Sequence, residues 1–111
     1  SKSAREVLES LRGQQADQPK NSELVINVAE AALRCGSHEE AISAYERAIE
    51  LDPRVDLRIT YYQWLGYLHD AREEHTAALE AYQKWSALDS QALEAYDRQA
   101  GLLVRLQRWT D

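Results

Sequence analysis

The sequence predicts an all-α fold of about six helices, arranged as antiparallel hairpins. Ala, Leu, Glu, Gln and Arg dominate the chain, and all five are good helix formers. Strand-like alternation rich in Val, Ile and Thr is absent from the sequence. A two-helix pattern also recurs along the 111 residues, which favours a repeat architecture.

The first complete hairpin covers residues 22–51. Apolar residues recur at helical spacing through its first half, which predicts the first helix. Gly36 suits the left-handed residue that ends a helix. Ser37 and Glu40 have the spacing of a capping box, in which each side chain bonds the backbone amide of the other residue. Pro53 ends the second helix because it lacks an amide hydrogen.

The hairpin occurs a second time. Sliding the sequence along itself places Ala41 and Tyr45 on Ala78 and Tyr82. The offset is 37 residues, close to the two-helix period of about 34 residues of the tetratricopeptide repeat (TPR) family, which these residues resemble. Small residues let neighbouring helix backbones approach, and large residues fill the space between them. The residues that match this packing pattern are Ala29, Ala41, Tyr45, Ala48, Pro53, Tyr62, Leu65, Gly66, Ala78 and Tyr82.

The resemblance implies a right-handed superhelical solenoid and divides the chain into four parts. Residues 1–21 are predicted to be the second helix of a preceding half repeat with its connector, and residues 22–55 a full repeat. Residues 56–92 form a repeat with an extended first helix, and residues 93–111 the first helix of a truncated third repeat. Because the chain does not begin with Met, we interpret it as a piece of a longer TPR protein.

The two outer parts depend on fewer residues. Val7, Leu8 and Leu11 are predicted to share one helix face ahead of the proline at position 19. Tyr96, Ala100 and Leu103 occupy the packing positions of the third repeat. These residues place the two outer parts of the chain in the frame of the repeat.

The second repeat departs from the family pattern in its loop and its second helix. Glu73 stands where glycine is usual, and Ser90 replaces the proline. Trp85 replaces a small residue, and overpacking of this kind costs about 1–3 kcal/mol in an ideal core. We expect the following helix to be displaced so that it admits the indole ring.

In the TPR family, the first helices of the repeats line a concave face that commonly binds extended peptides or a partner's helix. The resemblance therefore implies a non-enzymatic protein-binding module that scaffolds an assembly. Trp64 and Tyr67 are candidate aromatic anchors on this face, although both rings could instead pack against the long helix or the Pro53 loop. The candidate groove residues are Asn27, Glu30, Arg34, Trp64, Tyr67, Arg98 and Arg105.

The expected partner has basic and apolar residues, since the lining positions carry carboxylates beside the arginines. TPR co-chaperones bind the carboxylate tail of heat-shock proteins with conserved Lys, Asn and Arg side chains. Here Ile26, Glu30 and Trp64 occupy those positions in one frame and only Arg98 fits. The frame shifted by one repeat fails as well, so binding of the heat-shock tail is not expected.

Composition limits the remaining partner classes. The net charge of −6 and the lack of a Lys or Arg run argue against nucleic acid or an anionic membrane surface as a partner. No apolar run reaches the ~18 residues of a spanning helix, and no signal-peptide pattern is present. The compartment stays open, with the cytoplasm favoured. One cysteine, Cys35, excludes an internal disulfide.

Two motifs keep an enzyme or metal site in view. In HDAREEH, residues 69–75, His69 and Glu73 are one helical turn apart and could share a metal. Cys35 and His38 could form a nucleophile and base. We prefer the structural interpretation of both, because each residue has a place in the hairpins, and we expect no catalytic residue, metal or cofactor. A regulatory or substrate-positioning segment of a larger enzyme remains the alternative.

Self-association is a further alternative. Terminal repeats normally carry a polar outer face. The last predicted helix instead ends with Leu102, Leu103, Leu106 and Trp109, which nothing in the sequence covers. The terminal helices could therefore pair two copies of the chain, natively or as a result of truncation.

Overall fold

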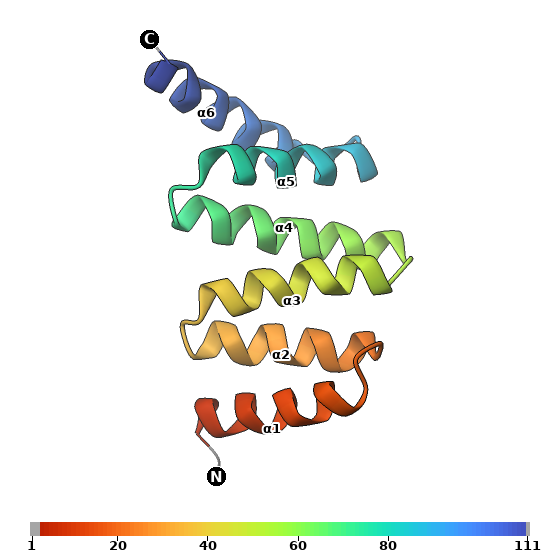
Figure 1. The fold of residues 1–111 in the computed structure, drawn as a ribbon. Coiled ribbons are helices and arrows are strands. Elements are labelled where there is room, and N and C mark those ends of the chain that lie inside the picture. The colour runs from red at the N-terminus through yellow and green to blue at the C-terminus, as the bar shows by residue number, and fades with distance from the viewer. Residues whose placement is uncertain (1–2, 111) are drawn as a thin grey trace. The chain divides into compact units, whose positions relative to one another are not determined.

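The computed structural model describes the backbone of residues 3–110 and the side chains of residues 3–107. Figure 1 shows that the described chain consists of helices joined by short loops. The predicted all-α class of helical hairpins is confirmed. The six helices are α1 (Ala4–Asp17), α2 (Ser22–Arg34), α3 (His38–Leu51), α4 (Val55–Ala71), α5 (His75–Leu88) and α6 (Leu93–Thr110).

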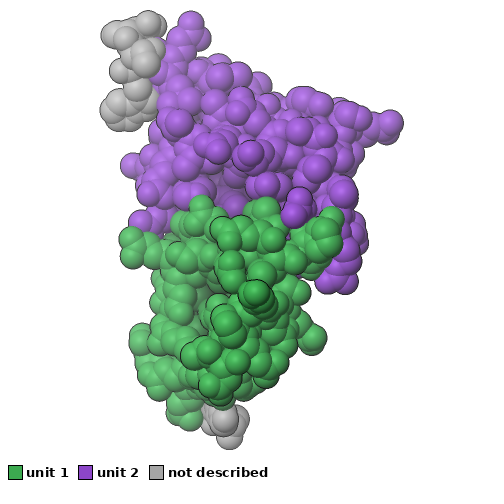
Figure 2. Space-filling view, turned by 45° about the vertical axis from the view of Figure 1, so that its right-hand side comes forward, with its two compact units in different colours: residues 1–53 green, residues 54–111 purple. Residues whose placement is uncertain are grey.

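The helices belong to two compact units, coloured separately in Figure 2. Unit 1 is residues 1–53 and unit 2 is residues 54–111. In unit 1, α2 packs on both α1 and α3. In unit 2, α5 packs on both α4 and α6. Each unit thus has one central helix with a neighbour on either side.

The core of unit 1 is made of small and medium-sized apolar side chains. Ala29 and Ala41, predicted as close-packing residues, are fully buried, and so is nearly all of the Tyr45 ring. Small side chains allow the helices to approach, and the tyrosine fills the space that remains. Leu8 joins this core from α1. Val7 was predicted to share the face of Leu8, but it is exposed. Adjacent residues point in different directions around a helix, so Val7 does not face the core that Leu8 enters.

The loop between α2 and α3 satisfies the end of α2 with backbone bonds. Gly36 takes the left-handed conformation, with φ of 73°. The Ser37 amide donates to the carbonyl of Ala32 at 2.9 Å, and the Gly36 amide donates to that of Leu33 at 3.1 Å. These two bonds define a Schellman motif, which glycine at this place favours.

The predicted capping box at the start of α3 is wrong. The Ser37 side chain makes no cap hydrogen bond. The Ser37 amide already donates a hydrogen bond in the Schellman motif, so it does not need the Glu40 carboxylate as an acceptor. Glu40 is used elsewhere: both of its carboxylate oxygens accept from the guanidinium of Arg12 on α1, and the Nε bond measures 2.7 Å. The pair ties α1 to α3, and its hydrogen bonds hold the pKa of Glu40 below the ordinary value of 4.5.

The core of unit 2 is built around aromatic rings. Tyr82 is fully buried, and its ring centroid lies 6.3 Å from that of Trp85. Gly66 on α4 lies directly against the Tyr82 ring. Trp85 is almost completely buried in a cluster with Tyr82, Ala95 and Leu102, so the indole is accommodated between α5 and α6. The displacement of α6 that we expected for this purpose stays a prediction.

The loop between α4 and α5 repeats the Schellman motif without a glycine. Glu73 has φ of 59°, a left-handed conformation that side chains disfavour. The amides of Glu74 and Glu73 donate to the carbonyls of His69 and Asp70 at 2.9 and 3.0 Å. The Glu74 carboxylate also lies 3.0 Å from Nδ1 of His69 and accepts from Arg72. These contacts hold a conformation that Glu73 alone would not favour.

Helix α6 is buried on one face and exposed on another. Tyr96, Ala100 and Leu103, which match packing positions of the family, are all exposed. Ala95 and Leu102 are buried instead. A first helix of a hairpin has one face for the preceding helix and another for its own second helix. In the described part of unit 2, the backbone of α6 packs closely on α5, and α6 reaches α4 only through polar side chains such as Glu94 and Arg105, so the face for a second helix is not covered.

The residues proposed for self-association also differ in whether they are buried or exposed. Leu102 belongs to the core of unit 2, so it is not available to a second copy. Leu103 is exposed, and Leu106 is half-buried beside the α4–α5 loop. The side chain of Trp109 lies outside the described residues.

Candidate functional site

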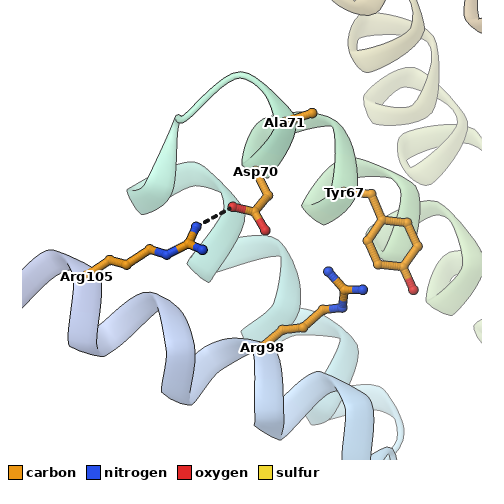
Figure 3. Close-up of a pocket in the computed structure, with 5 residues that line it drawn as sticks. All are labelled: Tyr67, Asp70, Ala71, Arg98 and Arg105. Carbon is orange, nitrogen blue, oxygen red and sulfur yellow. Dashed lines mark ion pairs between the residues drawn. The ribbon is translucent and has the colours of Figure 1, made fainter.

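Unit 2 contains a hollow of about 450 Å³ between α4 and α6. Figure 3 shows its lining residues, of which Tyr67, Asp70 and Ala71 come from α4, and Arg98 and Arg105 from α6. Three of the residues expected to line the groove, Tyr67, Arg98 and Arg105, are therefore brought together. Both helices are first helices of hairpins, which is why their side chains meet over α5.

A hydrogen-bonded triad forms one end of this hollow. The Tyr67 hydroxyl and the Arg98 Nε both donate to the same oxygen of Glu94, each at 2.8 Å. Burial and the bond to Glu94 raise the pKa of Tyr67 to about 12. The bonds from Tyr67 and Arg98 lower the pKa of Glu94, so its carboxylate is ionised at neutral pH. The triad fixes the Tyr67 ring, since its hydroxyl has one strong acceptor.

Aromatic contacts extend the triad in two directions. The Arg98 guanidinium lies 4.6 Å from the ring centroid of Tyr67 and 5.7 Å from that of Tyr82, within the range of a cation–π contact. Figure 3 shows Arg98 reaching from α6 toward Tyr67. On the other side, Trp64 meets Tyr67 edge to face, with centroids 6.1 Å apart. The Trp64 side chain does not line the hollow, but it is 39% exposed beside it.

The other end of the hollow is an ion pair. Arg105 lies 3.5 Å from Oδ1 of Asp70, and His75 Nδ1 lies 4.0 Å from the same oxygen. This oxygen is buried and accepts no hydrogen bond from the described residues. The contact between Asp70 and Arg105 was not predicted from the sequence. Each arginine of the hollow therefore has a carboxylate partner within unit 2.

Unit 1 has a hollow of its own, of about 400 Å³. Asn27, Glu30 and Arg34, the remaining predicted groove residues, lie along its α2 side. The α1 side is apolar, and this contribution was not predicted as a binding surface. The complete lining is Ala4, Val7, Leu11, Asn27, Glu30, Ala31 and Arg34.

The two motifs considered for catalysis or metal binding lie at the loops of the hairpins. Within the described range, no group of three or more His, Cys, Asp or Glu side chains is placed to hold a metal ion. His69 faces Glu74 rather than Glu73, which forms the loop. Cys35 is a half-buried free thiol at the end of α2. None of the helices described is long and apolar enough to cross a bilayer.

Repeated helical hairpins define a helical-repeat architecture, and both hollows lie along the first helix of a hairpin. Residues 22–55 match the family model of the tetratricopeptide repeat, so this part of the chain is a tetratricopeptide repeat. No curated protein matches the chain significantly in sequence. Repeats of this family generally mediate protein–protein interactions and are typically not enzymes.

Proposed function

We propose that the surface formed by Trp64 and the hollow of unit 2 binds an extended peptide or a helix of a partner protein. The observation that carries this proposal is the exposed Trp64 ring, which stands edge to face on Tyr67. Aromatic side chains held in one orientation lose little entropy on binding and are common hot spots. Through such binding the chain would scaffold a multiprotein assembly.

The charges of this surface favour a partner with basic and apolar residues. Arg98 and Arg105 are already paired with Glu94 and Asp70. Glu94 is half exposed, and Asp97 on the next turn of α6 is exposed as well. A lysine or arginine of the partner can approach these carboxylates while an apolar side chain packs on Trp64. We expect no binding of the heat-shock-protein tail, because its carboxylate would meet these acids.

The proposal is tested by photo-cross-linking from two positions. A benzophenone amino acid replaces Trp64 in one variant and the exposed Lys84 of α5 in the other. Proteins captured from source-cell extract are digested, and the cross-linked peptides are identified by mass spectrometry. We expect peptides with basic and apolar residues from position 64 and not from position 84. The same peptides captured equally from both positions would contradict a site at Trp64.

The identified peptide is then synthesised and its affinity is measured by calorimetry. We expect Trp64→Ala to weaken binding by tenfold or more, about 1.4 kcal/mol, as for a hot-spot residue. Lys84→Ala serves as the matched control and should bind as the wild type does. Equal affinities of all three proteins would show that Trp64 is not an anchor. Circular dichroism and the melting temperature establish that each variant is folded.

A further inference from the structure

The carboxylates at the two ends of the unit 2 hollow are held very differently. One oxygen of Glu94 accepts two hydrogen bonds, from Tyr67 and Arg98, each at 2.8 Å. Oδ1 of Asp70 is buried and accepts no hydrogen bond from the described residues. A buried acceptor without a partner raises the free energy of the folded protein, and a charged acceptor does so more strongly. Asp70 is therefore the lining residue whose hydrogen bonding is incomplete.

Two nitrogen atoms approach Asp70 without coming within hydrogen-bond distance. Nη1 of Arg105 lies 3.5 Å from Oδ1, and Nδ1 of His75 lies 4.0 Å from it. Hydrogen bonds from nitrogen to oxygen in proteins measure about 2.7–3.2 Å. The side chain of Arg105 is also 58% exposed, and ion pairs as exposed as this one contribute little to stability. Arg105 can therefore leave Asp70 at little cost.

The other end of the hollow shows how a guanidinium binds here when the fit is close. Arg98 donates through Nε to Glu94 at 2.8 Å, and its guanidinium lies 4.6 Å from the ring centroid of Tyr67. The carboxylate supplies charge and an acceptor, and the ring supplies a flat surface that attracts a cation. At the Asp70 end the carboxylate is present, but the nearest guanidinium does not make the hydrogen bond.

One oxygen of Asp70 is open to the hollow. Figure 3 shows Oδ1 turned toward Arg105, whereas the second oxygen points into the space between α4 and α6, on the side of Arg98. The Asp70 side chain is 26% exposed although Oδ1 is buried, so its exposure lies elsewhere than at Oδ1. The hollow measures about 450 Å³, within the range of about 300–1,000 Å³ that is usual for ligand sites. A side chain entering the hollow can therefore reach Asp70.

We propose that Asp70 binds an arginine of the partner, and that Arg105 occupies this position until the partner arrives. This assignment rests on the binding function proposed above and names the residue that selects the partner's charge. Arginine fits better than lysine because its planar guanidinium donates two hydrogen bonds to one carboxylate. As the partner's arginine enters, Arg105 turns into solvent. The charge beside Asp70 is unchanged by this exchange, since one guanidinium replaces another.

This contact is separate from the Trp64 anchor. Trp64 does not line the hollow, so a small arginine compound can bind Asp70 without it. Trp64→Ala is expected to leave binding of such a compound unchanged. Loss of peptide binding at Trp64 and loss of arginine binding at Asp70 are therefore distinguishable.

The first test uses N-acetyl-argininamide as the probe. The compound is titrated into ¹⁵N-labelled protein, and NMR follows the backbone amides of Asp70 and Ala71 and the side-chain Nε–H of Arg105. We expect saturable shifts at each of these groups. N-acetyl-citrullinamide is the matched control, because its urea group has the shape of a guanidinium without the charge, and it should cause no such shifts. Shifts that do not saturate, or equal shifts with both compounds, would overturn the proposal.

Three variants separate the roles of the residues in this titration. Asp70→Asn removes the charge with little change of shape and should weaken probe binding by about tenfold or more. Arg105→Gln removes the competing guanidinium and should strengthen binding by up to about fivefold, the range of an exposed ion pair. Glu80→Gln removes a carboxylate from the exposed surface of α5, so it controls for net charge and should bind as the wild type does.

The variants can also contradict the proposal. Wild-type affinity in Asp70→Asn would show that another group accepts from the probe, and weaker binding by Arg105→Gln would show that Arg105 does not compete with it. Melting temperatures establish that each variant is folded. Unfolding cannot produce a gain of affinity, so Arg105→Gln remains decisive even if Asp70→Asn is unstable.

A second test uses the partner peptide captured at position 64. Each arginine of the synthetic peptide is replaced in turn by citrulline, and binding is measured by calorimetry. One replacement should weaken binding to wild type by about tenfold or more and have little further effect on binding to Asp70→Asn, because the two changes remove the same contact. Equal losses with both proteins would assign the arginine to a different acceptor, such as Glu94, and would overturn the proposal.

Discussion

The ring of Tyr82 occupies the space beside Gly66 so completely that a Cβ on residue 66 would lie 2.7 Å from both Cδ1 and Cζ of the ring. Real Cβ atoms do not approach other atoms this closely. Tyr82 is fully buried and its ring has no room to withdraw. The closeness of α4 and α5 in unit 2 therefore depends on the absence of a side chain at Gly66.

We expect Gly66→Ala to destabilise the protein. Overpacking costs about 1–3 kcal/mol, and the better helix propensity of alanine offsets about 1 kcal/mol of it. Gly101→Ala on α6 is the matched control, because a Cβ there meets no atom within 4 Å and should stabilise its helix. Urea unfolding of the two variants measures the free energies. A gain in stability for Gly66→Ala equal to that of Gly101→Ala would contradict the packing described.

The pairing of Gly66 with Tyr82 could be predicted from sequence because it depends on a repeated small-and-large pattern. The same holds for Ala29, Ala41 and Tyr45, which the pattern places in the core of unit 1. Such positions have one packing environment in every repeat. The pattern is therefore informative wherever a helix has both of its neighbours.

The pattern is less informative where a residue has a choice of partners or lacks a neighbour. Glu40 could satisfy the Ser37 amide or pair with Arg12, and only the folded backbone shows that the amide is already bonded. Tyr96 and Leu103 match packing positions, but no second helix covers them in the described part of unit 2. Arg98, Arg105 and Tyr67, three of the residues assigned to the groove, line one hollow, while their role in binding stays a prediction.

We predict opposite effects for introducing a glycine in one hairpin loop and replacing the glycine of the other. Glu73→Gly should stabilise the protein by about 1 kcal/mol, because a left-handed conformation costs an ordinary residue roughly 1–2 kcal/mol and glycine loses more backbone entropy on folding. Gly36→Ala should destabilise it by a similar amount, since φ is 73° there. Thermal unfolding of both variants checks the signs. Lower stability of Glu73→Gly would show that contacts of the Glu73 side chain outweigh the strain.

Substitutions at Trp85 separate the volume of the indole from its polar atom. Trp85 Nε1 is buried, and no described residue accepts a hydrogen bond from it. Trp85→Phe removes this unpaired donor while keeping an aromatic ring, so we expect a change below about 1 kcal/mol. Trp85→Ala should cost about 3–5 kcal/mol, because it leaves a cavity between α5 and α6. A Phe variant as unstable as the Ala variant would indicate that Nε1 has an acceptor such as water.

The contact between Tyr67 and Glu94 should make stability depend on pH in the acid range. The hydrogen bond from Tyr67, followed in size of effect by that from Arg98, lowers the pKa of Glu94 below the ordinary value of 4.5. The stabilisation from ionised Glu94 is therefore present above the unfolded-state pKa of this group, and it is lost as the pH falls through its folded-state pKa. Wild type should melt higher than Glu94→Gln at pH 7, and the difference should disappear near pH 3. Because Glu94 is 51% exposed, the effect should stay below about 1 kcal/mol.

Tyr67→Phe provides the control for this pH effect. Removing the hydroxyl removes the largest cause of the pKa shift at Glu94, so adding Glu94→Gln to Tyr67→Phe should change the melting temperature less than Glu94→Gln does alone. The four proteins of this cycle are compared by thermal unfolding at pH 7 and pH 3. Additive effects of the two substitutions at pH 7, or an equal wild-type advantage at both pH values, would show that the hydrogen bond does not couple Tyr67 to Glu94 in solution.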